Sequence, residues 1–306
     1  MKLRARLLET PVFVAVILAA LLATGCGRKA DSAGATSAAN ATPKPEGWDL
    51  RGQIVEVNKE RGTLTVHHEE IPNFMPAMVM EFKVSPGDLA TAKPNAHIRG
   101  WLYRAGDDWV LEKIWPDDDA ARRAVETATE ALKQDTAIRG PYPYREVGEQ
   151  APDFALYDQD GRVVQASRFL GRRIVLNFIF TRCPDPKMCP AATAKMMALQ
   201  AGAKEESISG IEFISITLDP KYDTPGILRQ YADDHGIDTA NFSFLTGPQI
   251  AVTNLMAQLG VVAIEKDGLI THSLATLLID GNGKIIHRED GTGWPVEQFM
   301  ARLRTK

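Results

Sequence analysis

The chain has 306 residues, which is enough for two domains of about 150 residues each. Hydrophobic residues make up 44% and charged residues 24%, as is typical of a globular protein with a buried core. The formal net charge is −4, which argues against a nucleic-acid-binding protein, because such a protein needs a basic surface. The chain holds only three cysteines, Cys26, Cys183 and Cys189, so it is not a small scaffold built on disulfides.

Residues 1–25 have the composition of a secretory signal peptide. Three basic residues within the first six positions precede a short apolar run at 12–22 and then small residues. The run is shorter than the roughly 20 residues of a membrane-spanning helix. Cys26 follows directly and resembles the lipidated cysteine of a bacterial lipobox, which implies an extracytoplasmic, periplasmic lipoprotein held at the membrane by its N-terminal lipid. A plain secretory signal with an incidental cysteine is the alternative.

Residues 26–47 are rich in small and polar residues and predict a flexible tether. Residues 48–116 then predict a small all-β domain. Five stretches have the β-branched or alternating composition of strands: 53–57, 63–66, 81–84, 98–103 and 109–114. So many short strands in so short a segment indicate a small closed barrel.

Three consecutive acidic residues at 117–119 predict the start of a helix that runs to about Lys133, within a helical connector at 117–146. From residue 147 to 306 strands and helices alternate. Strands are predicted at 173–180, 211–218, 274–279 and 284–288, and helices at 190–204, 224–235, 248–259 and 295–303. The fold class is therefore an α/β domain, a sheet layered by helices, preceded by the barrel.

Cys183 and Cys189 lie between the first long strand and the helix predicted from Pro190. The helix N-terminus favours the thiolate form of Cys189, which redox chemistry and metal binding both require. A pair of thiols outside the cytoplasm forms either a disulfide or part of a metal site. A strand-to-helix turn with two nearby thiols is characteristic of the thioredoxin fold.

A second concentration of soft ligands occurs in the predicted barrel. Residues 67–80 hold two of the six histidines and three of the nine methionines of the chain. Met78 and Met80 are two positions apart and project from one face of a strand, and His67 or His68 ends the strand before. Thioether and imidazole groups prefer Cu(I), although a methionine-lined core would have the same composition.

The segment from about residue 147 to the C-terminus resembles the SCO/SenC family, thioredoxin-like copper chaperones of cytochrome c oxidase assembly. The matching motifs are Gln150-Ala-Pro-Asp-Phe154, Asn177-Phe-Ile-Phe-Thr-Arg-Cys-Pro184, Thr217-Leu-Asp-Pro220, Asp223-Thr-Pro225, Thr271-His-Ser273 and Leu278-Ile-Asp280. The resemblance implies copper ligation by Cys183, Cys189 and His272. The family usually has three residues between its cysteines, whereas this chain has five, and a structural disulfide is the competing interpretation. Asp219 and Asp223 either steady the cysteine loop, orient His272, or serve only in capping and turns.

The segment at 48–116 resembles the CusF-like periplasmic copper-binding domain, which is a small barrel. The resemblance implies copper ligation by His68, Met78 and Met80, with His67 as a competitor of His68. The tryptophan that covers the ion in that family is replaced here by Met75. Met75 is therefore expected either to add a thioether ligand or to leave the site more exposed.

Both resemblances imply one function: an exported, lipid-anchored copper metallochaperone, with delivery to a copper-receiving protein, most plausibly a subunit of cytochrome c oxidase. Two other functions stay open, a copper-tolerance buffer and an enzyme, a thiol–disulfide oxidoreductase that uses Cys183 and Cys189 as a redox pair on a partner's copper site. The reductant is disfavoured because a two-residue cysteine spacing and a proline before the late strand are both missing. A peroxiredoxin-like peroxidase is disfavoured because its Pro-x-x-x-Thr-x-x-Cys pattern is absent before Cys183.

Overall fold

The computed structural model describes residues 46–140, 144–266 and 269–305. The expected signal peptide (1–25), the expected lipidation site Cys26 and nearly all of the expected tether lie outside the described residues. Within the ranges that are described, no helix is both long and apolar enough to span a membrane.

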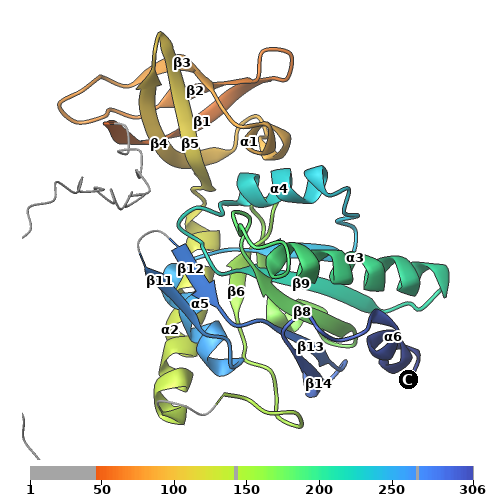
Figure 1. Ribbon diagram of the computed structural model, residues 1–306. Helices are drawn as coiled ribbons and strands as arrows, with labels where there is room; N and C mark the ends of the chain where they lie inside the picture. Colours follow the sequence, from red (N-terminus) through yellow and green to blue (C-terminus); the bar gives the residue numbers. More distant parts are fainter. Residues whose placement is uncertain (1–45, 141–143, 267–268, 306) are drawn as a thin grey trace, which may run out of the picture. The chain divides into compact units, whose positions relative to one another are not determined.

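The N-terminal part is a closed five-stranded barrel, as predicted, with the strand order β1-β2-β3-β5-β4 (Figure 1). Its strands are β1 (Gly47–Asn58), β2 (Thr63–His68), β3 (Met78–Lys83), β4 (His97–Ala105) and β5 (Asp108–Pro116). Neighbouring strands are antiparallel, except where β3 meets β5 in parallel. Apolar side chains that alternate along these strands fill the interior, among them Leu50, Leu64, Phe82, Leu102 and Leu111.

A short helix that was not predicted, α1 (Pro86–Thr91), follows β3. Ser85 caps it, because its side chain accepts a hydrogen bond from the backbone N–H of Asp88, and Pro86 occupies the first helical position. The run Ser85-Pro86-Gly87 therefore starts a helix.

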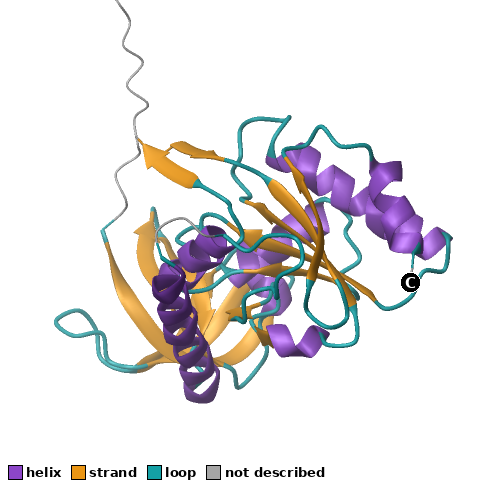
Figure 2. Ribbon diagram, turned by 90° about the horizontal axis from the view of Figure 1, so that it is seen from below, coloured by secondary structure: helices purple, strands orange, loops and turns teal. Residues whose placement is uncertain are grey.

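The C-terminal part contains a five-stranded mixed sheet in the order β10-β9-β8-β13-β14. Its strands are β8 (Arg173–Ile179), β9 (Ile211–Thr217), β10 (Phe242–Leu245), β13 (Ala275–Ile279) and β14 (Ile285–Asp290). The first three are mutually parallel, and β13 runs antiparallel to both β8 and β14. Helices lie on both sides of the sheet (Figure 2), and this arrangement is the thioredoxin-like fold that the sequence predicts.

Four helices of this domain begin and end within one residue of their predicted limits: α3 (Cys189–Glu205), α4 (Pro225–Asp234), α5 (Gln249–Gln258) and α6 (Val296–Arg304). Helix α3 packs against β8, β9 and α6. Strands β8 and β9 are buried on both faces, which explains their nearly continuous apolar sequence.

The shortest elements are not predicted from the sequence. These are β10, a 3₁₀ turn at Ala166–Phe169, the hairpin of β6 (Ala155–Tyr157) and β7 (Val163–Gln165), and the hairpin of β11 (Ala263–Lys266) and β12 (Leu269–His272). A strand of three or four residues is too short to show an alternating pattern. The second hairpin matters for the site, because it ends at His272.

Helix α2 (Asp119–Arg139) begins where predicted, with Asp118 as its N-cap, but it continues well past Lys133 and ends at Gly140. Its inner face joins the core of the C-terminal domain through Leu132. The side-chain amide of Gln258, in α5, donates to Asp135 (2.8 Å) and to the Thr136 hydroxyl (2.9 Å). The connector helix is therefore a packed layer of the C-terminal domain.

Candidate metal centre

Cys183, Cys189 and His272 meet at one end of the mixed sheet. One potential ligand atom from each lies within 4.8 Å of the other two. The imidazole Nε2 of His272 is 3.5 Å from the sulfur of Cys189, and both cysteines are free thiols. The structure therefore brings together the three residues that the sequence identifies as candidate copper ligands.

The loop at 183–189, with five residues between the two cysteines, folds into a turn. The backbone N–H of Met188 donates to the Asp185 carbonyl (3.1 Å), and the backbone N–H of Lys187 donates to the Asp185 carboxylate (2.9 Å). On the outer side, the hydroxyl of Thr292 donates to the Lys187 carbonyl (2.8 Å). Because the turn directs the chain back to the start of α3, the two thiols stay close despite five intervening residues.

Two acidic residues fix the segment just before the loop. Asp223 is fully buried and accepts hydrogen bonds from the Thr181 backbone N–H (3.1 Å), from the Thr181 hydroxyl and from the Thr217 hydroxyl (2.5 Å). Asp219 forms an ion pair of 2.5 Å with Arg182, whose guanidinium lies 3.9 Å from the ring centre of Tyr222. Of the roles left open by the sequence, these contacts support anchoring of the cysteine loop.

The imidazole of His272 is oriented by a backbone group. Its Nδ1 lies 3.0 Å from the carbonyl oxygen of Ser273, so a proton on Nδ1 donates to that carbonyl and Nε2 keeps its lone pair toward Cys189. Burial lowers the pKa of His272, which favours the neutral imidazole that can bind a metal. An orienting role was one of the possibilities left open for Asp219 and Asp223, but the group at Nδ1 is a backbone carbonyl, which leaves no signal in a residue pattern.

The two thiols differ in their environments. Cys183 is half-buried, whereas Cys189 is fully buried at the first position of α3. Burial raises the pKa of the Cys189 thiol, the backbone N–H of Phe180 at 3.4 Å lowers it, and repulsion from Cys183 raises it further. Desolvation is the largest of these influences, and it acts against the Cys189 thiolate that the helix N-terminus is expected to favour.

The barrel places its soft ligands on one face of the β2–β3 pair. His68 lies directly opposite Met78, and Val66 lies opposite Met80. Residues opposite one another on antiparallel strands share a face, so His68, Met78 and Met80 lie together on the side that also carries the buried Phe82. His67 is exposed on the other side, which removes it as a competitor of His68 for this face.

His68 is buried with one ring nitrogen unused. Its Nδ1 lies 2.7 Å from the Glu69 carbonyl, while Nε2 has no hydrogen-bond partner among the described residues. Gly52, the neighbour of His68 across the β1–β2 pair, allows the two strands to approach closely, since a Cβ at Gly52 would lie 2.7 Å from the His68 Cα. A buried nitrogen without a partner costs about 1–3 kcal/mol, so the arrangement is suited to a ligand that uses it.

Met75 lies in the segment between His68 and Met78. Its backbone pairs with Ile71 through two hydrogen bonds of 2.9 and 3.1 Å, and its side chain is half-buried against the barrel core. The neighbouring Phe74 stacks on Trp48 with a centroid separation of 3.5 Å. Met78, by contrast, is 43% exposed, so the methionine face is open to solvent at one edge.

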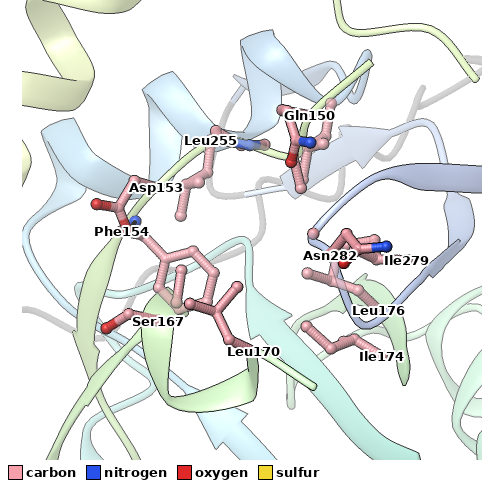
Figure 3. A pocket seen from close by; sticks show the side chains of 15 residues that line it. Gln150, Asp153, Phe154, Ser167, Leu170, Ile174, Leu176, Leu255, Ile279 and Asn282 are labelled. Atoms are coloured by element: carbon pink, nitrogen blue, oxygen red, sulfur yellow. Dashed lines mark hydrogen bonds between the residues drawn. The ribbon is translucent and has the colours of Figure 1, made fainter. Parts of the chain in front are cut away.

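An apolar pocket of about 260 Å³ lies at the other end of the sheet (Figure 3). Phe154, Leu170, Leu176 and Leu255 line its walls. Ile174, near the start of β8, also lines the pocket, whereas the cysteine loop follows the end of that strand. No thiol, thioether or imidazole is among the residues that line this pocket, so it lacks the soft ligands of the proposed copper sites.

Comparison with known proteins identifies both parts. The SCO1/SenC family matches residues 143–306, and the copper binding periplasmic protein CusF matches residues 48–116. The SCO1 protein homolog of Bacillus subtilis is 30% identical over 173 residues, which cover 55% of this chain and 86% of that protein. The SCO2-like protein RT0576 of Rickettsia typhi is 32% identical over 140 residues, which cover 44% of this chain and 66% of that protein. Among solved structures, a SCO1/SenC family lipoprotein from Bacillus anthracis is 28% identical, with a TM-score of 0.47 over 53% of this chain and 98% of that one.

Proposed function

Because this chain belongs to the SCO1/SenC family, we propose that it is a copper-binding metallochaperone that holds Cu(I) between Cys183, Cys189 and His272. The approach of these three side chains to within 4.8 Å carries the proposal. Two thiolate sulfurs and one imidazole nitrogen are soft ligands that suit Cu(I). A bound cation also offsets the desolvation that raises the pKa of Cys189, so metal binding and thiol deprotonation occur together.

Delivery proceeds by ligand exchange. Cys183 is half-buried and Cys189 is fully buried, so a ligand of the receiving protein reaches the copper from the Cys183 side. The proposed receiving protein is a copper-binding subunit of cytochrome c oxidase. The site is extracytoplasmic, and the lipid at Cys26 holds the protein at the membrane next to that partner.

The barrel is a second Cu(I) site, with His68, Met78 and Met80 as ligands and Met75 as an additional thioether. The unpaired Nε2 of His68, on the same face as both methionines of β3, supports this assignment. The match of residues 48–116 to the copper binding periplasmic protein CusF supports it as well.

The decisive experiment is Cu(I) titration of the reduced full chain against a chromophoric Cu(I) chelator. Two equivalents should bind to the wild type and one to the Cys183→Ser/Cys189→Ser variant. The variant Met78→Leu/Met80→Leu should also bind one equivalent, but at the tighter thiolate site. Unchanged stoichiometry in the cysteine variant would refute the Cys/Cys/His site.

The same preparations distinguish the two rival functions. A thiol–disulfide oxidoreductase would reduce an oxidised copper-site peptide in the absence of copper, and a buffer would bind copper without transferring it to an apo oxidase fragment. The metallochaperone requires transfer of copper to that fragment, with loss of transfer in the His272→Ala variant.

A further inference from the structure

The outer face of β1, β4 and β5 carries a hollow that the copper chemistry does not use. It has a volume of about 650 Å³, which lies in the range of ligand-binding pockets. Its lining combines three cations and one carboxylate with two indole rings: Arg51, Arg99, Lys113, Asp49, Trp101 and Trp115. Neither His68 nor the methionines of β3 line it.

Two of the three cations, Arg51 and Arg99, lie next to each other on adjacent strands. Arg51 and Arg99 are direct partners in the β1–β4 ladder, an arrangement of like charges that destabilises a sheet. Arg51 has one long ion pair, 3.5 Å to Asp117. Among the described residues, Arg99 and Lys113 have no carboxylate within ion-pair distance, and the guanidinium of Arg99 lies 5.6 Å from the ring centre of Trp115. The lining therefore carries a net positive charge, from three cations and one carboxylate, in a chain whose net charge is −4.

Lys113, the third cation of the hollow, has a strained backbone conformation. Lys113 has φ of 53°, in the left-handed region that ordinarily favours glycine. It sits where the β4–β5 register shifts, so a β-bulge displaces it from the regular ladder. Gly100, across from the bulge, allows the two strands to approach closely, since a Cβ there would lie 3.0 Å from the Glu112 carbonyl and 3.0 Å from the side chain of Leu111 in the barrel core. A strained backbone conformation of this kind is typical of positions where the side chain has a function.

We propose that this hollow, which we name the basic hollow (Arg51, Arg99, Lys113, Trp101 and Trp115), binds an acidic segment of a partner protein. Carboxylates of the segment pair with the three cations and relieve their mutual repulsion, and an apolar side chain lies on an indole face. A protein segment fits better than a membrane, because the tryptophans are half-buried around a concave floor and do not project as interfacial anchors do.

Fluorescence anisotropy of a labelled octapeptide of alternating glutamate and leucine, titrated with the full chain, tests the proposal. The wild type should bind the peptide, and binding should weaken when salt rises from about 50 to 300 mM because the contacts are ionic. Arg51→Gln/Arg99→Gln should raise the dissociation constant at least tenfold. The matched control Lys59→Gln/Arg61→Gln removes two exposed charges at the β1–β2 turn, outside the hollow, and should leave it unchanged.

Lys113→Gly separates binding from folding. Glycine removes both the strain and the charge, so this variant should resist urea better than the wild type while binding the peptide more weakly. Cu(I) stoichiometry should be unaffected in every variant, so that failure of this inference is distinguishable from failure of the proposed copper sites. No peptide binding by the wild type, equal weakening in the control variant, or binding only to vesicles containing phosphatidylglycerol would each overturn the proposal.

Discussion

Asp223 holds the cysteine loop against the sheet through hydrogen bonds. Its carboxylate accepts three hydrogen bonds, two from Thr181 and one from Thr217, and no solvent reaches it. Burial raises its pKa from 3.8 to about 6, although these hydrogen bonds act in the opposite direction. Near neutral pH the protein therefore keeps a charge in its interior to hold the loop in place.

The sign of this shift predicts how stability depends on pH. Because the folded-state pKa exceeds the unfolded value, the folded protein binds the proton more tightly, and the free energy of unfolding falls as pH rises from about 4 to about 6. The loss is at most about 3 kcal/mol for a shift of this size. Urea unfolding of wild type and Asp223→Asn across this range measures it, and the variant should have the flatter profile. Glu60→Gln, at an exposed site, is the control, and equal slopes in all three proteins would contradict the assignment.

The two thiols should react in a fixed order. Cys183 is half-buried, whereas Cys189 is fully buried beneath the loop and accepts the Phe180 N–H. Iodoacetamide should therefore modify Cys183 at least tenfold faster in the reduced protein, as followed by mass spectrometry of the peptides. Prior addition of Cu(I) should protect both. Comparable rates at the two cysteines would mean that the loop opens far more readily than its contacts imply.

At the scale of single residues, the sequence predicts which side chains can bind copper better than it predicts how buried these side chains are and which groups orient them. The motifs around Cys183, Cys189 and His272 predict which side chains meet, and the structure brings them within 4.8 Å. The burial that raises the pKa of Cys189 and the Ser273 carbonyl that orients His272 both depend on tertiary packing. Neither leaves a trace in residue spacing.

At the scale of elements, the register of the β2–β3 pair determines which of the two adjacent histidines faces the methionines. A shift of one residue would turn His68 outward and His67 inward, so the pairing of His68 with Met78 selects which histidine faces the thioethers. Sequence alone predicts that Met78 and Met80 share a face, but it cannot choose between adjacent histidines at a strand end. Helices with a regular apolar face, such as α4 and α6, are predicted to within one residue, whereas the hairpin that carries His272 is too short to be recognised.

The methionines of β3 can be tested apart from stability. Met78→Leu/Met80→Leu should abolish Cu(I) or Ag(I) binding by the barrel and change the free energy of unfolding by less than about 1.5 kcal/mol, because leucine conserves volume. Isothermal titration with Ag(I) in the Cys183→Ser/Cys189→Ser background isolates the barrel site.

The matched control for this test uses methionines of the C-terminal core. Met256→Leu/Met300→Leu makes the same chemical change at buried positions and should retain Ag(I) binding. A barrel variant that unfolds, together with a cysteine-free parent that binds no Ag(I), would show that Met78 and Met80 serve only as core.

For the whole molecule, the two proposed sites differ in the charge of their ligands. The barrel offers neutral thioethers and an imidazole, whereas the C-terminal site offers two sulfurs that become thiolates when copper binds. Thiolates hold Cu(I) more tightly, so copper on one chain should move from the barrel to the cysteines. Because both sites belong to one chain, the cysteine site is also at a high effective concentration for copper that leaves the barrel site.

The redox state of Cys183 and Cys189 should control this movement. Their oxidation to a disulfide transfers two electrons to the oxidant and releases two protons, which removes both sulfur ligands. X-ray absorption on the full chain loaded with one equivalent of Cu(I) reports the ligands directly. The reduced wild type should show thiolate coordination, whereas the diamide-oxidised wild type and the Cys183→Ser/Cys189→Ser variant should both show thioether and imidazole coordination. Copper that stays on methionine and histidine in the reduced wild type would show that transfer does not run in this direction.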